Sequence, residues 1–194
     1  MKFSKKSLIL ITFFLIGLIY ILSPGPDSID DFEAIPDSLK SDEPGDTYQV
    51  PEVAAYFSDF NRESITNFYR DDFREKFIFG WIFPPISLNY PPIAAYQYVR
   101  DLLQQSTFLE EYIYPLRGSI FVNGYEPHVE KEIKKFTHDK SGGPMQIKGQ
   151  YFKSKTTIRF YPVSAHLALL TYLGIWVALI LLFRLFEKVV GEEI

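Results

Sequence analysis

The chain contains no cysteine, and this absence excludes several kinds of scaffold and site. Without cysteine there is no disulfide framework, no thiolate ligand for a metal ion and no thiol nucleophile. Three common catalytic signatures are also missing: a glycine-rich phosphate loop, the HExxH metal motif and the GxSxG nucleophile elbow. The sequence therefore offers none of these catalytic motifs, and the lack of cysteine is compatible with a domain outside the cytoplasm.

Histidine is scarce, and the three residues present show no pattern of metal ligands. His128 and His138 lie near a Gly-Gly loop, whereas a metal site needs ligands that converge from a rigid frame. Adjacent acids such as Asp71 and Asp72 point about 100° apart on a helix, so they do not share a proton. We therefore expect no metal, no cofactor and no catalytic residue, and a non-enzymatic role is favoured.

Charge is missing from two long runs near the ends of the chain. Residues 163–183 contain no Asp, Glu, Lys or Arg. As a helix this run measures about 31 Å, which matches the hydrocarbon core of a bilayer, about 30 Å thick. Residues 7–23 are also apolar but shorter, and they span only if the preceding lysines extend to the interface. We predict transmembrane helices over both ranges.

The first apolar run has two interpretations. Lys2, Lys5 and Lys6 precede the apolar core, which is typical of a cleavable signal peptide. The run ends in YILSPGPDS, however, which lacks the small-x-small pair of a cleavage site and has a proline in its place. A retained signal anchor is therefore favoured, with cleavage as the alternative.

Basic residues close to the two runs predict the orientation. Lysines precede the first run, and Arg184 and Lys188 follow the second. Basic residues beside spans are enriched on the cytoplasmic side. We therefore expect a two-pass protein of the cytoplasmic membrane, with the tails 1–6 and 184–194 inside and residues 24–162 outside.

Three residues of the second run are candidates for a specific role. Gly174 and Ala178 stand four positions apart, a small-xxx-small spacing that lets two helices approach closely, although such pairs also occur by chance. His166 is an ionisable residue near the outer end of the run. We expect it to be an interfacial anchor, with a proton relay as the alternative.

Residues 24–47 are acidic and rich in proline. They hold eight acidic residues, four prolines and one lysine. Low hydrophobicity and high charge do not support a packed core. The composition therefore predicts an extended linker between the first span and a folded domain over residues 48–162.

Periodicity predicts the elements of this domain. Residues 61–77 place apolar side chains three and four positions apart, which indicates an amphipathic helix capped by Asn61. The run FIFGWIF, residues 77–83, predicts a buried strand; an aromatic loop that enters the outer leaflet is the alternative. Residues 90–106 predict a second helix. Residues 128–143 fit either a short helix or a strand.

The remaining patterns predict turns and strands. Asn123-Gly124 is a dipeptide favoured in tight type I′ turns. Residues 145–152 and 156–163 alternate apolar and polar side chains, which predicts a hairpin with its loop at Lys153–Lys155. The predicted fold class is an α+β extracytoplasmic domain between two transmembrane α-helices, with two or more helices packed on a small mixed or antiparallel sheet.

Positive charge is concentrated near the second span. Residues 131–160 contain eight basic residues and two acidic ones. The candidate basic face comprises Lys148, Lys153, Lys155 and Arg159. It has three interpretations: a solvated hairpin edge, a surface for lipid headgroups or a protein partner, or a surface that receives the acidic linker.

The function predicted from these features is structural. We expect an accessory or scaffold subunit that binds membrane lipid or other membrane or envelope proteins at the outer surface of the membrane. Nucleic acid is not an expected partner, because no reading motif is present. The alternative is an envelope enzyme or a solute-binding sensor domain with a site that the sequence does not reveal.

Overall fold

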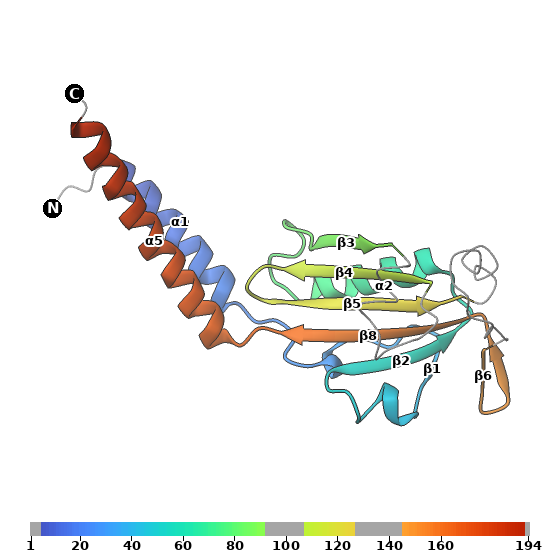
Figure 1. Ribbon diagram of the computed structural model, residues 1–194. Coiled ribbons are helices and arrows are strands. Elements are labelled where there is room, and N and C mark those ends of the chain that lie inside the picture. Colours follow the sequence, from blue (N-terminus) through green and yellow to red (C-terminus); the bar gives the residue numbers. More distant parts are fainter. Residues whose placement is uncertain (1–4, 92–106, 127–144, 193–194) are drawn as a thin grey trace. The chain divides into compact units, whose positions relative to one another are not determined.

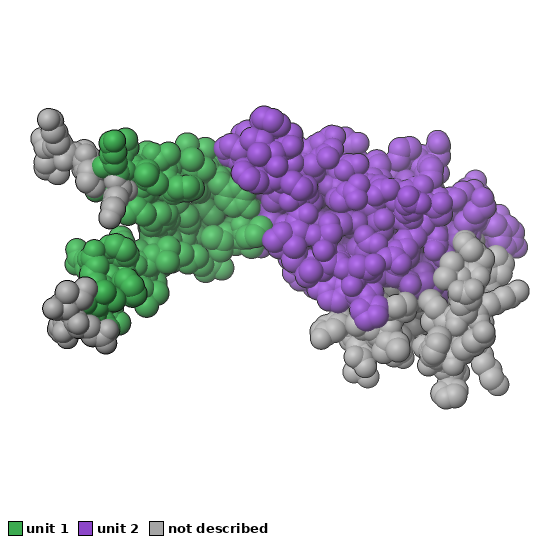
Figure 2. Space-filling model, turned by 90° about the horizontal axis from the view of Figure 1, so that it is seen from above, with its two compact units in different colours: residues 1–24, 115–117, 163–194 green, residues 25–114, 118–162 purple. Residues whose placement is uncertain are grey.

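The computed structural model describes residues 5–91, 107–126 and 145–192 (Figure 1). By its internal contacts the chain divides into two compact units (Figure 2). The first unit holds residues 1–24, 115–117 and 163–194, and the second holds residues 25–114 and 118–162. The second unit combines helix and sheet, which confirms the predicted α+β class.

A six-stranded antiparallel sheet forms the centre of the second unit, in the order β1-β2-β8-β5-β4-β3 (Figure 1). Its strands are β1 (Leu39–Lys40), β2 (Val53–Ser58), β3 (Ile86–Tyr90), β4 (Phe108–Tyr114), β5 (Gly118–Tyr125) and β8 (Ser154–Pro162). A separate hairpin consists of β6 (Met145–Ile147) and β7 (Gln150–Phe152). The long pairings of β8 with β5 and β2 make β8 a central strand, and most of its side chains are buried.

Helix α2 (Arg62–Glu75) lies across one face of the sheet and confirms the helix predicted after Asn61 (Figure 1). The Asn61 side chain accepts a hydrogen bond from the Ser64 N–H at 2.9 Å, which satisfies a donor that has no partner within the helix. Tyr69 and Phe73 are fully buried. The same core cluster contains Ile65, Phe77, Phe108, Tyr112, Tyr114, Ile120, Val122, Ile158 and Phe160. Aromatic rings therefore fill most of the layer between α2 and the sheet.

The acidic segment (residues 25–47) is folded against the sheet, which differs from the extended linker predicted for residues 24–47. It contains the 3-10 turns η1 (Ile29–Asp31) and η2 (Pro44–Asp46), and β1, which pairs with β2. Ile29, Phe32 and Ile35 are buried in the core cluster. The prediction from average composition overlooked these three side chains. Their burial offsets the conformational entropy that is lost when the segment becomes ordered.

Two predictions about individual elements are wrong. Residues 77–83 form successive turns and not a buried strand. Asn123 and Gly124 lie within β5 and not in a turn. A Cβ at position 124 would overlap the Phe108 ring, so the glycine serves close packing in a strand.

The hairpin near the end of the domain is also displaced from its predicted position. Its turn lies at Lys148-Gly149, where φ is 51° and 78°, the left-handed geometry of a type I′ turn. The predicted loop at Lys153–Lys155 is therefore wrong, because Lys155 belongs to β8. The predicted helix at 90–106 lies outside the described residues apart from residues 90 and 91, and so does the segment 128–143.

The first unit contains two apolar helices, α1 (Lys5–Leu22) and α5 (Ala165–Glu192). Within the described part of the chain, only α5 is long and apolar enough to cross a membrane, over Ala165–Val190. The apolar part of α1, Ser7–Leu22, is shorter. A membrane crossing by α1 therefore stays a prediction.

Helices α1 and α5 lie side by side and pack through aromatic residues (Figure 1). The Tyr172 hydroxyl donates a hydrogen bond to the Phe14 carbonyl at 2.7 Å, and the two rings stack with centroids 5.7 Å apart. Trp176 meets the Phe14 ring edge-on at 5.5 Å. A Cβ at Gly17 would overlap the Tyr172 phenol, so this glycine makes room for the contact.

Candidate functional site

Exposed apolar side chains gather in the turn that follows α2. We call residues 77–83 the aromatic loop. Four of its side chains are exposed to solvent: Ile78, Trp81, Ile82 and Phe83. Trp81 is 81% exposed, an unusual position for the largest apolar side chain. A contiguous apolar surface of this kind marks a contact site, because burying it is favourable.

The backbone of the aromatic loop is held in place while these side chains point outward. Phe77 is buried, with its ring centroid 4.3 Å from that of Tyr114. The Tyr114 hydroxyl donates to the Phe83 carbonyl at 3.0 Å, and the Gly80 N–H donates to the Phe77 carbonyl at 2.9 Å. A Cβ at Gly80 would overlap the Arg74 carbonyl, so only glycine allows this close approach. The exposed side chains therefore sit on a preorganised support.

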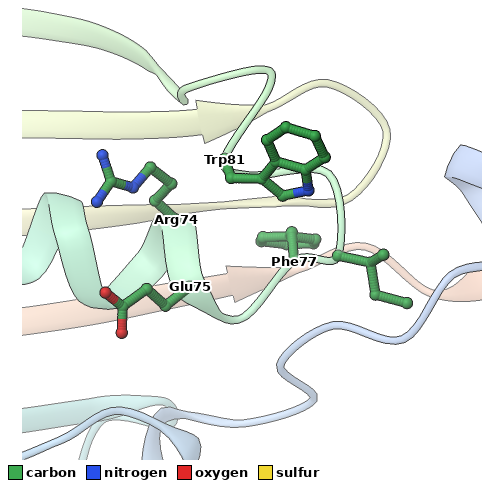
Figure 3. Close-up of a pocket in the computed structure, with 5 residues that line it drawn as sticks. Arg74, Glu75, Phe77 and Trp81 are labelled. Carbon is green, nitrogen blue, oxygen red and sulfur yellow. The ribbon is translucent and has the colours of Figure 1, made fainter.

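A shallow pocket of about 490 Å³ lies beside the aromatic loop (Figure 3). Trp81 and Phe77 line it from the loop, while Arg74 and Glu75 line it from the last turn of α2. The site thus combines an apolar wall with one cation and one anion. This combination suits an amphipathic partner with a charged or zwitterionic group beside an apolar body.

The strand register places a row of partly exposed side chains across one end of the sheet, on the face opposite α2. Ile86 pairs with Ile113, which pairs with Ser119, which in turn pairs with Tyr161. The side chains of this row lie on one face, and Ile86 and Tyr161 are exposed. The row lies at the end of the sheet where β8 finishes at Pro162. The aromatic loop leads into β3 at this same end.

A buried ion pair holds the acidic segment to the sheet. The Lys155 ammonium lies 2.7 Å from Asp46 Oδ2 and 3.6 Å from Glu43 Oε2. Only 9% of the Lys155 side chain and 6% of the Asp46 side chain are exposed. The Ser41 hydroxyl donates to the same Asp46 oxygen at 2.6 Å, and Lys155 lies over the Phe57 ring. Lys155 is therefore a structural residue and not part of an exposed surface.

The other members of the predicted basic face are spread over different surroundings. Lys148 pairs with Asp42 at 2.8 Å, and this hydrogen bond lowers the pKa of the Asp42 carboxyl. Lys153 is exposed, and its backbone N–H donates to Asp59. The Arg159 guanidinium lies over the Tyr161 ring, 4.7 Å from its centroid. Two of the four residues, Lys148 and Lys155, thus bind the acidic segment, which is the third interpretation of this charge.

A polar network ties the start of α2 to the sheet. Arg62 Nη2 lies 2.7 Å from Glu110 Oε1, and the Arg62 backbone N–H donates to Glu126 Oε1 at 2.8 Å. The Tyr112 hydroxyl donates to Glu110 Oε2 at 2.7 Å. Burial and the neighbouring Glu110 raise the pKa of Tyr112 above its ordinary value. These contacts position structural elements.

The candidate residues of the C-terminal helix are all exposed. A Cβ at Gly174 would meet nothing within 4 Å, and Ala178 is also exposed. Within the chain, α1 packs at Tyr172 and Trp176 and not at these two residues, so a contact of Gly174 and Ala178 with another helix stays a prediction. His166 is exposed in the first turn of α5.

No family model, curated protein or solved structure matches this chain. Among the described residues, no group of three or more His, Asp or Glu side chains could hold a metal ion. His128 and His138 lie outside those residues. Function must therefore be inferred from the surfaces that the described residues present.

Sequence reasoning underrated the aromatic loop because six large apolar residues in seven are typical of a buried strand. The signals against a strand were Gly80 within the run and Pro84-Pro85 directly after it. The buried role of Lys155 had no local signal, because position 155 falls on the face of the strand opposite Ile158 and Phe160, where a lysine is expected to be exposed. No local pattern indicated that its carboxylate partner would be Asp46.

Proposed function

We propose that this chain is a two-pass membrane protein whose α+β domain lies outside the cytoplasmic membrane and serves as an accessory or scaffold subunit of a membrane complex. The observation that carries this proposal is the exposed apolar surface of α5. Over Ala165–Val190 most side chains are apolar, and most of these are exposed. Such a helix measures about 39 Å, longer than the hydrocarbon core, and lipid is the solvent that suits its surface.

The contact between α1 and α5 supports a membrane crossing by α1. Phe14 of α1 packs on Tyr172 and Trp176, which lie near the middle of α5. The opposite side of α1 is also apolar and exposed, with Leu8, Ile9, Leu15, Ile16 and Ile19 among its exposed residues. A short apolar helix that packs on a spanning helix and exposes apolar side chains elsewhere is suited to the same lipid environment.

Orientation is tested by single cysteines, because the natural chain has none. In intact cells, a membrane-impermeant maleimide should label Gln150→Cys, an exposed position of β7. It should label Glu187→Cys, near the end of α5, only after the membrane is opened. Labelling of both positions in intact cells, or of neither, would contradict the two-pass topology.

The role as a subunit is tested by native mass spectrometry of the full-length protein, extracted from its own membrane in a mild detergent. The expected result is a second polypeptide at fixed stoichiometry. A lone chain that carries a small molecule would contradict the accessory role and support a sensor or an enzyme instead.

A further inference from the structure

We propose that the aromatic loop inserts into the interfacial region of the outer leaflet, with Trp81 at the level of the lipid headgroups. This inference rests on the proposed function, because it requires that α5 crosses the membrane. Its occupant is lipid and not a second protein. The supporting observations are the place of the loop in the sheet, the chemistry of its side chains and the rigidity of its backbone.

The register places the loop at the end of the sheet from which the chain continues into α5. The loop leads into Ile86, which pairs with Ile113 of β4. At the same end, Gly118 of β5 pairs with Pro162, the last residue of β8. Only residues 163 and 164 separate Pro162 from the first residue of α5. This connection reaches at most about 11 Å, so a spanning α5 holds this end of the sheet close to the membrane surface.

The side chains of the loop match the interfacial region in chemistry. Residues 77–83 contain no charged residue. Tryptophan is enriched at membrane interfaces because its ring is apolar and its indole N–H is a hydrogen-bond donor. Trp81 is accompanied by the exposed Ile78, Ile82 and Phe83. Four exposed apolar side chains on one short loop form a surface that lipid acyl chains can cover.

The charged residues beside the loop fit the headgroup layer. Arg74 and Glu75 line the pocket together with Trp81 (Figure 3). A guanidinium group binds phosphate, and a carboxylate binds an ammonium group. When Trp81 lies at the interface, these two side chains are placed at the depth of zwitterionic headgroups. At this depth the pocket meets phosphate and ammonium groups, whose charges complement those of Arg74 and Glu75.

The support for the loop reduces the cost of insertion. Phe77 is buried, Gly80 lies against the Arg74 carbonyl, and the Tyr114 hydroxyl holds the Phe83 carbonyl. Because the backbone is already ordered, little conformational entropy is lost when the side chains enter lipid. A flexible apolar loop would lose more conformational entropy on insertion.

The test uses the two tryptophans of the chain, Trp81 and Trp176, as separate reporters. Full-length protein is reconstituted into phosphatidylcholine vesicles that contain lipids brominated at shallow or deep acyl positions. Trp176→Phe leaves Trp81 as the reporter of the loop, and Trp81→Phe leaves Trp176 as the reporter of α5. Bromine quenches only tryptophan that it contacts.

A matched control places tryptophan at the opposite end of the sheet. Tyr151 is an exposed aromatic residue of β7, close to the start of β8. β8 is about 27 Å long, so this position lies well away from the end that is joined to α5. The control is Tyr151→Trp in a chain that also carries Trp81→Phe and Trp176→Phe.

The expected result is quenching of Trp81 by shallow bromines more than by deep ones, quenching of Trp176 by deep bromines, and no quenching of the tryptophan at position 151. Quenched Trp176 beside unquenched Trp81 would overturn the lipid contact of the loop and leave the spanning helix intact. Unquenched Trp176 would overturn the spanning helix itself, and the proposed function with it. Quenching at position 151 equal to that of Trp81 would overturn the specific role of the loop.

Discussion

Removing the Asp46 carboxylate tests whether the acidic segment is part of the folded domain. The substitution Asp46→Ala leaves the Lys155 ammonium buried without its 2.7 Å partner. Loss of one member of a buried ion pair typically costs about 3–5 kcal/mol. Glu43 remains 3.6 Å away but is largely exposed, so it compensates only in part. We therefore expect Asp46→Ala to lower the free energy of opening the acidic segment by about 3 kcal/mol, the lower end of this range.

Trypsin cleavage after Lys40 measures this opening in the full-length protein. Lys40 is the single basic residue of the acidic segment, and it lies in β1, paired with Tyr56 of β2. The enzyme cleaves only a chain that has left the sheet, so the cleavage rate follows the population of the open form. A cost of about 3 kcal/mol corresponds to about a 150-fold faster cut, followed by mass spectrometry of the fragments.

Two variants serve as controls for this measurement. Asp42→Ala removes an exposed pair with Lys148 and should leave the cleavage rate close to that of the natural chain. Asp46→Leu combined with Lys155→Met replaces the buried ions by apolar side chains and should restore most of the protection. The reasoning is refuted if the natural chain is cut as fast as an unfolded peptide, or if Asp46→Ala leaves the rate unchanged.

Two further predictions concern a buried hydroxyl and a helix contact. The Tyr69 hydroxyl is buried with no hydrogen-bond partner among the described residues, so Tyr69→Phe should preserve stability or raise it by up to about 1 kcal/mol in urea unfolding followed by Trp81 fluorescence. Burial raises the pKa of Tyr69 above 10.0, so the folded form loses stability as the pH rises above 10, where Tyr69 ionises first in the unfolded chain. Tyr69→Phe should therefore shift alkaline unfolding to higher pH. Lower stability of this variant at neutral pH would contradict this account. Gly17→Val should separate α1 from α5 by colliding with Tyr172, and it should lower the detergent melting temperature followed by Trp176 fluorescence. Gly174→Val, in open space on α5, should leave that temperature unchanged, and equal effects of the two changes would show that the contact at Gly17 is not formed.

Features that depend on neighbours along the chain could be predicted from the sequence. The helix α2 begins after Asn61 as expected, because capping and the three-and-four spacing are local properties. The alternation over residues 156–163 predicted β8 closely. The hairpin turn was misplaced because Lys153–Lys155 resembles a loop in composition, whereas the left-handed pair Lys148-Gly149 forms the turn.

Features of the candidate site depended on distant partners and could not be predicted in the same way. The aromatic loop has the composition of a core strand, and its exposure follows from the packing of Phe77 and Gly80 at the end of α2. The small-xxx-small pair at Gly174 is a genuine packing motif in other helices. Here the bulkier Tyr172 makes the contact, because the space for it is provided by Gly17 on the other helix.

The apolar helix α5, the amphipathic helix α2 and the α+β class could be predicted from the sequence alone, because length, charge and periodicity are properties of consecutive residues. Which charges and apolar groups meet depends on the tertiary structure. Ile29, Phe32 and Ile35 are too few to mark a folded segment by composition, yet each gains a buried site that the sheet provides. Lys155 and Asp46 lie far apart in the chain, and they form a buried pair because β8 and the acidic segment come together at the sheet. Long-range contacts of this kind stabilise a fold without leaving a local pattern.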